Sequence, residues 1–323
     1  MNHCRRHLVF ATLVVLAAGG ACAQTYPERP VRLVVPYAPG GSTDLIARQV
    51  AQPLGRVLGK AVVVDNKSGA GGMLGTAEVA RAAPDGYTLA IGTVSTMVIF
   101  PAVHPRPGYA IDQFAPVTNI AVMPNVIAVN PKFPAKDLPE LIAVLKANPG
   151  KYSFATSGIG SINHMLGESF QAGAGVKLNH VPYRGAGPAM QDVMAGQVDI
   201  LFDQLPSSKS FIDSGRLRLM GVISPQRVPE YPGVMTMNEA GLKGFADQAW
   251  YGIVAPSKTP PAVLARLSEA MKQVMAMPEV RARLEKAGAT PLGNSPAEYS
   301  AQIQGEIGAM KKLVKARNIT LEE

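Results

Sequence analysis

Short runs of β-branched apolar residues alternate with helical patterns along most of this chain. From Val31 the order is VRLVVPY, DLIARQVAQPLGRVLG, AVVVDN, MLGTAEVARAA and TLAIGTV. Alternation of this kind predicts βαβ units, in which helices cover a parallel sheet, so the fold class is α/β. On the first helix, Ile46, Val50, Leu54 and Leu58 fall on one side, and Pro53 is expected to kink it.

A second series begins after Pro131 and predicts a second α/β lobe at about residues 126–247. Its strands and helices are YSFAT, SINHMLGESFQA, LNHVPY, PAMQDVMAG, DILFD and RLRLMGVIS. About 300 residues exceed one typical core and suit two lobes. The segments IAVMPNVIAVN and AWYGIVAP bracket this series. They are either crossovers between lobes or core strands of one large sheet, and periodicity alone does not separate the two.

The N-terminus has the pattern of a cleaved secretory signal at residues 1–23. Arg5 and Arg6 precede an apolar run from Leu8 to Ala18, and Ala21-Cys22-Ala23 fits the small-residue cleavage pattern. The run is shorter than the roughly 20 residues that a membrane span needs. A lipid anchor on Cys22 is a minor alternative. We expect a mature chain that begins at Gln24, is located in the periplasm and does not insert into the membrane.

Both cysteines, Cys4 and Cys22, precede the predicted cut, so disulfides, thiolate metal sites and cysteine nucleophiles are not expected in the mature chain. Loss of Arg5 and Arg6 lowers the formal charge from +8 to +6. The basic residues are scattered and are not interleaved with aromatic residues, which disfavours a nucleic-acid partner.

The most informative motif is a strand that ends in a loop of Gly, Ser and Thr and opens directly into a helix. It occurs three times, as VVPYAPGGSTDLIAR, FATSGIGSINHMLGESF and HVPYRGAGPAMQDVM. The first N–H groups of a helix lack internal partners and the helix dipole is positive there, so backbone alone can hold an anion. Ligands of open α/β sheets bind where such loops gather.

Each loop also has a purely structural interpretation. Gly40, Gly41, Ser42 and Thr43 would form a tight turn, with Ser42 as the helix N-cap and Asp44 complementing the dipole. Any one such loop favours that interpretation, whereas three together favour a site. The second loop offers Thr156, Ser157, Gly158, Gly160 and Ser161, whose hydroxyls can donate to a carboxylate. Pro188 marks the start of the third helix.

Three polar side chains near these loops have open roles. Arg184 either pairs with an anion or is simply exposed, which is the commoner fate of an arginine. Asp203 follows a buried strand, where it would accept a hydrogen bond from a ligand or act as a turn residue. His164 has no partner at metal-ligand spacing, so a structural histidine is favoured and neither metal nor cofactor is expected.

Enzyme signatures are missing from the sequence. There is no G-x-S-x-G elbow or Walker sequence, and His104 and His180 lie in no catalytic pattern. GAGGMLG after AVVVDN departs from G-x-G-x-x-G and lacks the acidic residue that would bind a ribose. Because catalytic triads are defined by geometry, these absences do not by themselves exclude an enzyme.

Taken together, the motifs resemble those of the Bug-type substrate-binding receptors of tripartite tricarboxylate transport systems. VVPYAPGGSTDLIAR, VVVDNKSGAGGMLG, APDGYTLAIGT, SGIGSINHMLGESF, HVPYRGAGPAMQDVMAGQVDILFD, WYGIVAPSKTP and EIGAMKKLVKARNI occur in the family's order through essentially the whole chain. Tyr37 stands where the family often has Phe, and Met165 where it often has Leu.

The resemblance implies a type II periplasmic-binding-protein fold, with two α/β lobes joined by two crossover strands and an organic acid in the cleft between them. It implies that residues 25–125 and 248–323 form one lobe and residues 126–247 the other. The implied ligand-binding residues are Tyr37, Pro39, Gly40, Gly41, Ser42, Thr43 and Asp44 in the first loop, Thr156, Ser157, Gly158, Gly160, Ser161 and His164 in the second, and Arg184, Gly185, Ala186 and Asp203.

We therefore expect a monomeric periplasmic receptor that takes a small carboxylate to a transporter or a membrane sensor and performs no chemistry. The alternative is a secreted hydrolase or isomerase that acts on a carboxylate, for which no nucleophile or base is found. A structural or adhesive module is a third hypothesis, disfavoured because so many glycine-rich loops open onto helices.

Overall fold

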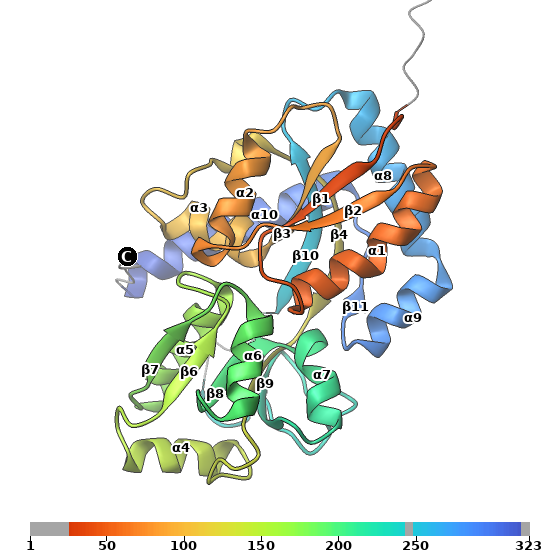
Figure 1. The fold of residues 1–323 in the computed structure, drawn as a ribbon. Coiled ribbons are helices and arrows are strands. Elements are labelled where there is room, and N and C mark those ends of the chain that lie inside the picture. Colours follow the sequence, from red (N-terminus) through yellow and green to blue (C-terminus); the bar gives the residue numbers. More distant parts are fainter. Residues whose placement is uncertain (1–25, 243–247, 318–323) are drawn as a thin grey trace, which may run out of the picture.

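The computed structural model describes residues 26–242 and 248–317, and its strands form two separate sheets (Figure 1). The first sheet has the order β11-β4-β10-β3-β1-β2. Its strands are β1 (Val31–Val35), β2 (Val62–Asn66), β3 (Thr88–Thr93), β4 (Phe114–Met123), β10 (Ala249–Pro256) and β11 (Thr290–Pro291). The second sheet has the order β7-β6-β8-β5-β9. Its strands are β5 (Asn125–Val129), β6 (Ser153–Thr156), β7 (Asn179–Pro182), β8 (Ile200–Gln204) and β9 (Arg218–Ile223).

Both sheets are mixed rather than wholly parallel. Strand β1 is parallel to β2 and β3, and β6 is parallel to β7 and β8, as expected for βαβ units. In contrast, β10 is antiparallel to β3 and β4, and β5 is antiparallel to β8 and β9. The antiparallel strands are those next to the segments where the chain changes sheet, so the prediction of parallel strands holds only within each βαβ series.

Helices pack against both sheets. Each sheet and its helices form one lobe of the molecule. Lobe 1, the upper one in Figure 1, contains the first sheet with α1 (Ser42–Leu58), α2 (Met73–Ala80), α3 (Phe100–Val103), α8 (Pro261–Ala276), α9 (Pro278–Lys286) and α10 (Pro296–Arg317). Lobe 2 contains the second sheet with α4 (Leu138–Ala147), α5 (Ile162–Ala174), α6 (Ala186–Ala195) and α7 (Leu205–Asp213). Short helical turns are η2 (Ala70–Gly72), η3 (Ser95–Ile99) and η4 (Ile111–Gln113).

Alternation along β1 explains how lobe 1 builds a core on each face of its sheet. Leu33 and the residues two positions before and after it pack against the buried Ile46 and Leu54 of α1. Val34 points to the opposite face, where it joins the cluster that contains Tyr299 of α10. The predicted apolar side of α1 is thus confirmed. The helix runs through Pro53 without interruption and ends where Gly59 adopts a left-handed φ of 76°.

The chain passes from lobe 1 to lobe 2 across a single residue. Strand β4 ends at Met123 in the first sheet, and β5 begins at Asn125 in the second, with Pro124 between them. The predicted crossover IAVMPNVIAVN therefore joins the lobes. The second predicted crossover, AWYGIVAP, lies wholly in the first sheet as β10, so the returning chain changes sheet before Ala249. Within the described ranges, no helix has both the length and the apolar character needed to cross a bilayer.

Candidate ligand-binding site

A small pocket lies between the two lobes, and its cavity volume in this closed arrangement is about 20 Å³. Lobe 1 supplies most of its wall from the ends of β1 and β3, the start of α1 and the start of β10. Lobe 2 supplies Ser157, Ile162, Ala186 and Gln204. The lining residues of lobe 1 are Tyr37, Gly41, Ser42, Thr43, Thr93, Val94, Ser95, Ala249 and Tyr251.

Four helices begin at this wall. Ser42 is the first residue of α1, Ile162 of α5 and Ala186 of α6, and Gln204 is the N-cap of α7. No side chain of their own N-cap residue caps α1, α6 or α7 in the described structure. The N-cap of α1 is Gly41 and not Ser42, and α6 begins two residues before Pro188. Four positive helix ends make the pocket favourable for an anion, although some first-turn N–H groups already have partners: Ile162 of α5 donates to Ser95 Oγ and Ser207 of α7 donates to Ser42 Oγ.

Neutral hydroxyl groups supply the rest of the pocket's polarity. They belong to Tyr37, Ser42, Thr43, Thr93, Ser95, Ser157 and Tyr251, all of them buried. No charged side chain is among the lining residues of the described chain. Burial raises the pKa of Tyr37 and of Tyr251, so both phenols keep their protons and can donate at neutral pH. An acid in this pocket would be held by neutral donors alone.

The lobes touch directly around the pocket. The Ala38 N–H donates to the Arg184 carbonyl oxygen at 3.0 Å, and the Ile162 N–H donates to Ser95 Oγ at 2.9 Å. Glycines allow this closeness, because a Cβ on Gly187 would overlap the carbonyl oxygen of Pro39. The structure is therefore the closed arrangement of the two lobes.

An amide network centred on Gln204 links both lobes at the pocket. Its Nε2 donates to Asn125 Oδ1 at 3.0 Å and also to Asn163 Oδ1. Its Oε1 accepts from the Tyr251 hydroxyl of lobe 1 at 3.0 Å. Asn125 begins β5, directly after the crossing from lobe 1, so Gln204 connects the pocket wall to that crossing.

The structure brings part of the predicted set together. The wall contains Tyr37, Gly41, Ser42, Thr43, Ser157 and Ala186. Outside the lining stand Pro39, Gly40, Asp44, Thr156, Gly158, Gly160, Ser161, His164, Arg184, Gly185 and Asp203. Several of these make hydrogen bonds within the loops that carry lining residues.

The Asp44 side chain makes hydrogen bonds that hold the first loop. Its carboxylate accepts from the Gly40 N–H at 3.2 Å and from Asn66 Nδ2 at 3.0 Å, and forms an ion pair with Arg48 at 2.9 Å. The same Asn66 donates to the Tyr37 carbonyl oxygen at 3.0 Å. Asp44 thus holds Gly40 directly and Tyr37 through Asn66, and its charge is paired with Arg48.

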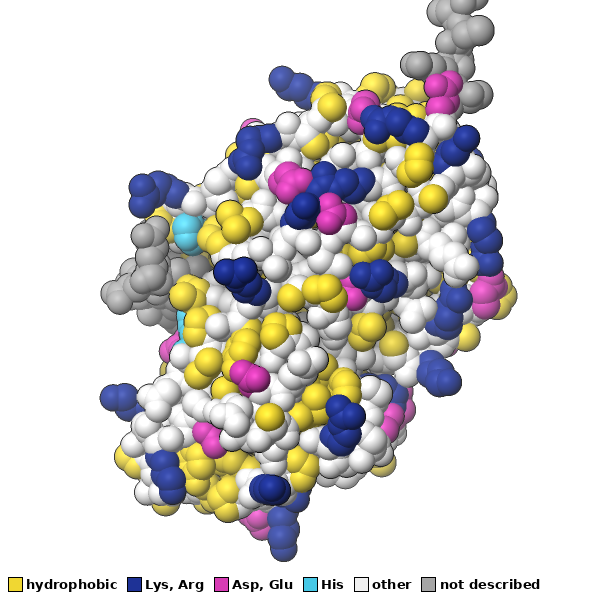
Figure 2. Space-filling model, in the orientation of Figure 1, with side chains coloured by type: hydrophobic (Ala, Val, Ile, Leu, Met, Phe, Trp, Pro, Cys, Tyr) yellow, Lys and Arg dark blue, Asp and Glu magenta, His cyan; other side chains and the backbone are white. Residues whose placement is uncertain are grey.

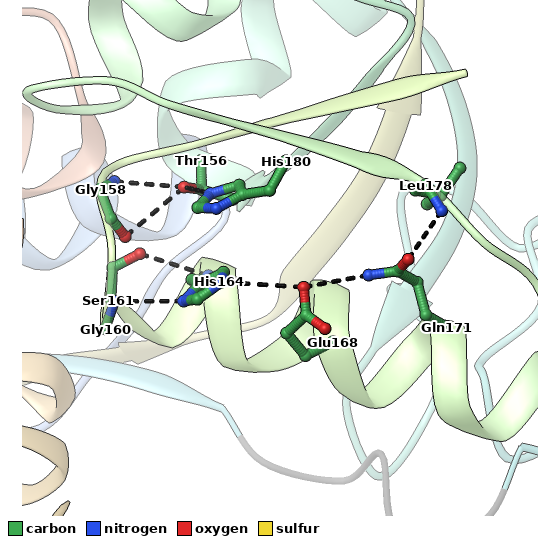
Figure 3. A network of polar contacts seen from close by, with 9 residues as sticks. All are labelled: Thr156, Gly158, Gly160, Ser161, His164, Glu168, Gln171, Leu178 and His180. Atoms are coloured by element: carbon green, nitrogen blue, oxygen red, sulfur yellow. Dashed lines mark hydrogen bonds and ion pairs between the residues drawn. The ribbon is translucent and has the colours of Figure 1, made fainter. Parts of the chain in front are cut away.

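Two stacked histidines support the second loop (Figure 3). The rings of His164 and His180 lie 4.1 Å apart and nearly parallel. His164 Nδ1 accepts from the Gly160 N–H at 3.2 Å, and His180 Nε2 lies 2.7 Å from Thr156 Oγ1. Thr156 Oγ1 in turn accepts from the Gly158 N–H at 3.2 Å. His164 is thereby a structural residue of the loop that carries Ser157.

Asp203 is buried behind the wall and bound by lobe 2. Its Oδ2 accepts from Ser207 at 2.5 Å and from Ser208 at 2.7 Å. Burial raises its pKa to about 6, an effect that these hydrogen bonds partly offset. Arg184 is exposed, and it contributes its backbone carbonyl to the contact between lobes.

Several wall residues were not predicted from the sequence. Thr93 is the last residue of β3 and Ser95 begins the helical turn η3, so this strand opens into a helical turn as in the three predicted loops but without a glycine pair. Pro206 in the first turn of α7 is a helix-start signal in the sequence. It could have identified Gln204, two residues before it, as the N-cap at this wall. Tyr251 lies within β10 and carries no comparable local signal.

Two further observations concern metals and the surface. In the ranges that the structure describes, no three His, Cys, Asp or Glu residues are grouped so that they could hold a metal ion. Figure 2 shows Lys and Arg side chains spread over both lobes on the face in view.

Two α/β lobes with a buried pocket between them define the class of two-lobed solute-binding proteins. The model of the tripartite tricarboxylate transporter family receptors matches residues 46–319, and the chain belongs to this family. Protein BugT of Bordetella pertussis (strain Tohama I) is 34% identical over 329 residues, covering 100% of each chain. The resemblance predicted from the motifs is thus confirmed, and so is the fold class.

Solved structures agree with this assignment. The periplasmic binding protein BugD is 37% identical with a TM-score of 0.88, covering 91% of this chain and 99% of that chain. MatC from Rhodopseudomonas palustris with bound malate is 34% identical with a TM-score of 0.85, covering 90% and 100%. An R. palustris protein with adipate is 32% identical with a TM-score of 0.87, covering 91% and 99%.

Proposed function

We propose that this chain captures a small carboxylate in the pocket between its lobes and delivers it, unaltered, to a tripartite tricarboxylate-type transporter or a membrane sensor. The observation that carries the proposal is the pocket wall itself. Four helices begin there and hydroxyl groups line it, with no charged side chain among the described lining residues. Hydrogen bonds to a charged group contribute roughly 1.5–3 kcal/mol each, so a few suffice for useful affinity.

The relatives support the chemical class of the ligand. Malate and adipate are both small dicarboxylic acids, and each is bound by a structural neighbour of this chain. We propose that the direct contacts come from Tyr37, Gly41, Ser42, Thr43, Ser157 and Ala186 of the predicted set, together with Thr93, Ser95, Gln204 and Tyr251. In this closed arrangement the pocket has room for about one water molecule, so the lobes must part to admit the acid.

The alternative hydrolase or isomerase is less well supported by the site. Catalysis by a hydroxyl nucleophile requires an adjacent base. The described wall contains hydroxyl groups but no His, Asp, Glu or Lys. The side chain of Ser42 instead contacts Ser207 of the other lobe at 2.7 Å.

We further propose a monomer located in the periplasm, with the predicted lobes of residues 25–125 plus 248–323 and of residues 126–247, except that Asn125, the first residue of β5, belongs to the second lobe. The family and the division of the strands between two sheets support this organisation. The predicted signal at residues 1–23 lies outside the described residues. The intact mass of the exported chain tests whether it begins at Gln24.

Binding and the absence of turnover can be tested together. Refolded protein would be titrated by calorimetry with a panel that includes malate, adipate and uncharged analogues, with and without a chelator. At 100 times the dissociation constant, the bound acid should stabilise the native state by about 2.7 kcal/mol, which is visible as a higher melting temperature. Mass spectrometry should recover the acid unchanged. Accumulation of a product, or binding that needs no carboxylate, would contradict the proposal.

A further inference from the structure

Helix α7 of lobe 2 is capped by a side chain of lobe 1. Its own N-cap residue, Gln204, makes no side-chain capping bond. The Ser207 N–H, in the first turn of α7, instead donates to Ser42 Oγ at 3.0 Å. Ser42 is the first residue of α1 on the other lobe and lines the pocket. A capping bond is normally local in sequence, whereas this one forms only when the lobes are together.

The same hydroxyl continues into a chain of hydrogen bonds within lobe 2. Ser42 Oγ lies 2.7 Å from Ser207 Oγ, which donates to Asp203 Oδ2 at 2.5 Å. Ser208 donates to the same carboxylate oxygen at 2.7 Å. Ser42, Asp203, Ser207 and Ser208 are each at most 2% exposed, so water does not compete for these groups.

The carboxylate fixes the direction of this chain. The Ser207 hydroxyl has two acceptors within reach, Asp203 Oδ2 at 2.5 Å and the Gln204 carbonyl oxygen at 3.1 Å, and we infer that its proton points to the nearer, charged carboxylate, which can only accept. The Ser207 oxygen then presents its lone pairs to Ser42, whose hydroxyl donates to it. Ser42 consequently both donates to and accepts from Ser207, which is two hydrogen bonds between the lobes from one side chain.

We propose that Ser207 and Asp203 are positioning residues that latch Ser42, and with it lobe 1, in the closed arrangement without touching the ligand. The inference rests on the proposed function in one respect: closure of the two lobes is the step that buries the acid. Asp203 then acts on Ser42 of the pocket wall indirectly, through two successive hydrogen bonds that Ser207 makes. Ser208 provides a matched comparison, because it shares the carboxylate oxygen and the helix but makes no bond to lobe 1 in the described structure.

The latch can be measured on the unliganded chain by energy transfer between dyes. Cysteines would replace the exposed Lys60 of lobe 1 and Lys132 of lobe 2, with Cys4 and Cys22 changed to serine. Ser207→Ala removes one hydrogen bond between the lobes and should lower the ratio of closed to open molecules about fivefold. Ser42→Ala removes both and should lower this ratio by up to about 30-fold. The double variant should lower it no further than the larger single effect. Ser208→Ala should leave the ratio unchanged.

The outcomes separate this inference from the proposed function. An unchanged ratio in Ser207→Ala, or equal shifts in Ser207→Ala and Ser208→Ala, would overturn the latch. Additive effects of Ser42→Ala and Ser207→Ala would overturn it as well, because residues that act through one shared contact are not additive. Circular dichroism checks that each variant is folded. Since no ligand is added, failure of every acid in the panel would refute the proposed function and leave this result standing.

Discussion

His180 is a side chain whose protonation the fold strongly disfavours. It lies half-buried between Phe154 and His164, with ring centroids 4.8 Å and 4.1 Å away. Burial lowers its pKa to about 4, and the neighbouring His164 adds to the effect. Burial also lowers the pKa of His164. A proton on either ring would place charge in the stack that supports the second loop.

The sign of the resulting pH dependence follows from linkage. An unfolded histidine titrates near pH 6.5. Between about pH 6.5 and 4, the unfolded chain therefore binds a proton at His180 that the native chain does not bind. We predict that the His180 contribution to the free energy of unfolding is lost as pH falls through this window. Asp203 works in the opposite direction, because its raised pKa of about 6 makes the native state bind a proton more readily than the unfolded chain.

Nuclear magnetic resonance isolates the histidine. The His180 ring proton should titrate with a midpoint near pH 4 in the folded chain. His180→Phe, which keeps an aromatic ring in the stack, should reduce the fall in melting temperature between pH 6.5 and 5. A midpoint at or above pH 6, or an unchanged fall in the variant, would show that the stack does not exclude the proton.

At the scale of elements, the start of α6 is the part of lobe 2 that fits most tightly against lobe 1. Gly187 is the second residue of α6, and its backbone lies directly against the carbonyl oxygen of Pro39. We predict that Gly187→Ala leaves lobe 2 folded, since alanine is favoured over glycine in a helix by roughly 0.5–1 kcal/mol. It should nevertheless weaken binding of the best acid at least about tenfold, because the added methyl group meets backbone that cannot rotate away.

Gly305→Ala is the matched control for this variant. Gly305 lies in α10, and an added Cβ there would meet no atom within 4 Å. The control should keep the parental affinity in calorimetry. If Gly187→Ala bound as tightly as Gly305→Ala, the close fit of α6 against the Pro39 loop would not be needed for capture.

For the whole molecule, closure can be captured as a covalent bond. A Cβ built on Gly41 would lie 3.3 Å from the Cβ of Ala186 on the other lobe, and a disulfide spans about 3.5–4.5 Å between Cβ atoms. Gly41 has an ordinary extended backbone, with φ of −83° and ψ of 167°, so it accepts a side chain. With Cys4 and Cys22 changed to serine, we predict that Gly41→Cys with Ala186→Cys forms an intramolecular disulfide under mild oxidation.

Thiol titration and intact mass would detect this bond. The oxidised chain should release and take up acid more slowly than the reduced form of the same variant. Gly41→Cys with Gly233→Cys is the control, because a Cβ at Gly233 has no neighbour within 4 Å. Free thiols after oxidation, or parental exchange in the cross-linked chain, would argue that the two lobes do not part around this contact.

The sequence by itself determined the features that local chemistry controls. Periodicity identified the strands and the apolar side of α1, because burial of Ile46 and Leu54 depends on spacing along one helix. The loops around Gly41 and Ser157 were predicted because a strand that ends in glycine and hydroxyl residues before a helix is a local signal. Such a signal cannot separate a residue that faces the ligand from one that supports the loop, and Asp44 and His164 each accept a hydrogen bond from the backbone of their loop.

Which distant residues meet depends on the assembled fold. Gln204 and Asn125 are opposite one another on β8 and β5 of the second sheet, whereas the hydrogen bond from Tyr251 of β10 to Gln204 exists because the two lobes meet. The partnership of Ser42 with Ser207 is of the same kind, spanning 165 residues of chain. Hydrogen-bond partners across lobes depend on the closing geometry, and that geometry is set by packing of the whole molecule rather than by the residues on either side of each serine.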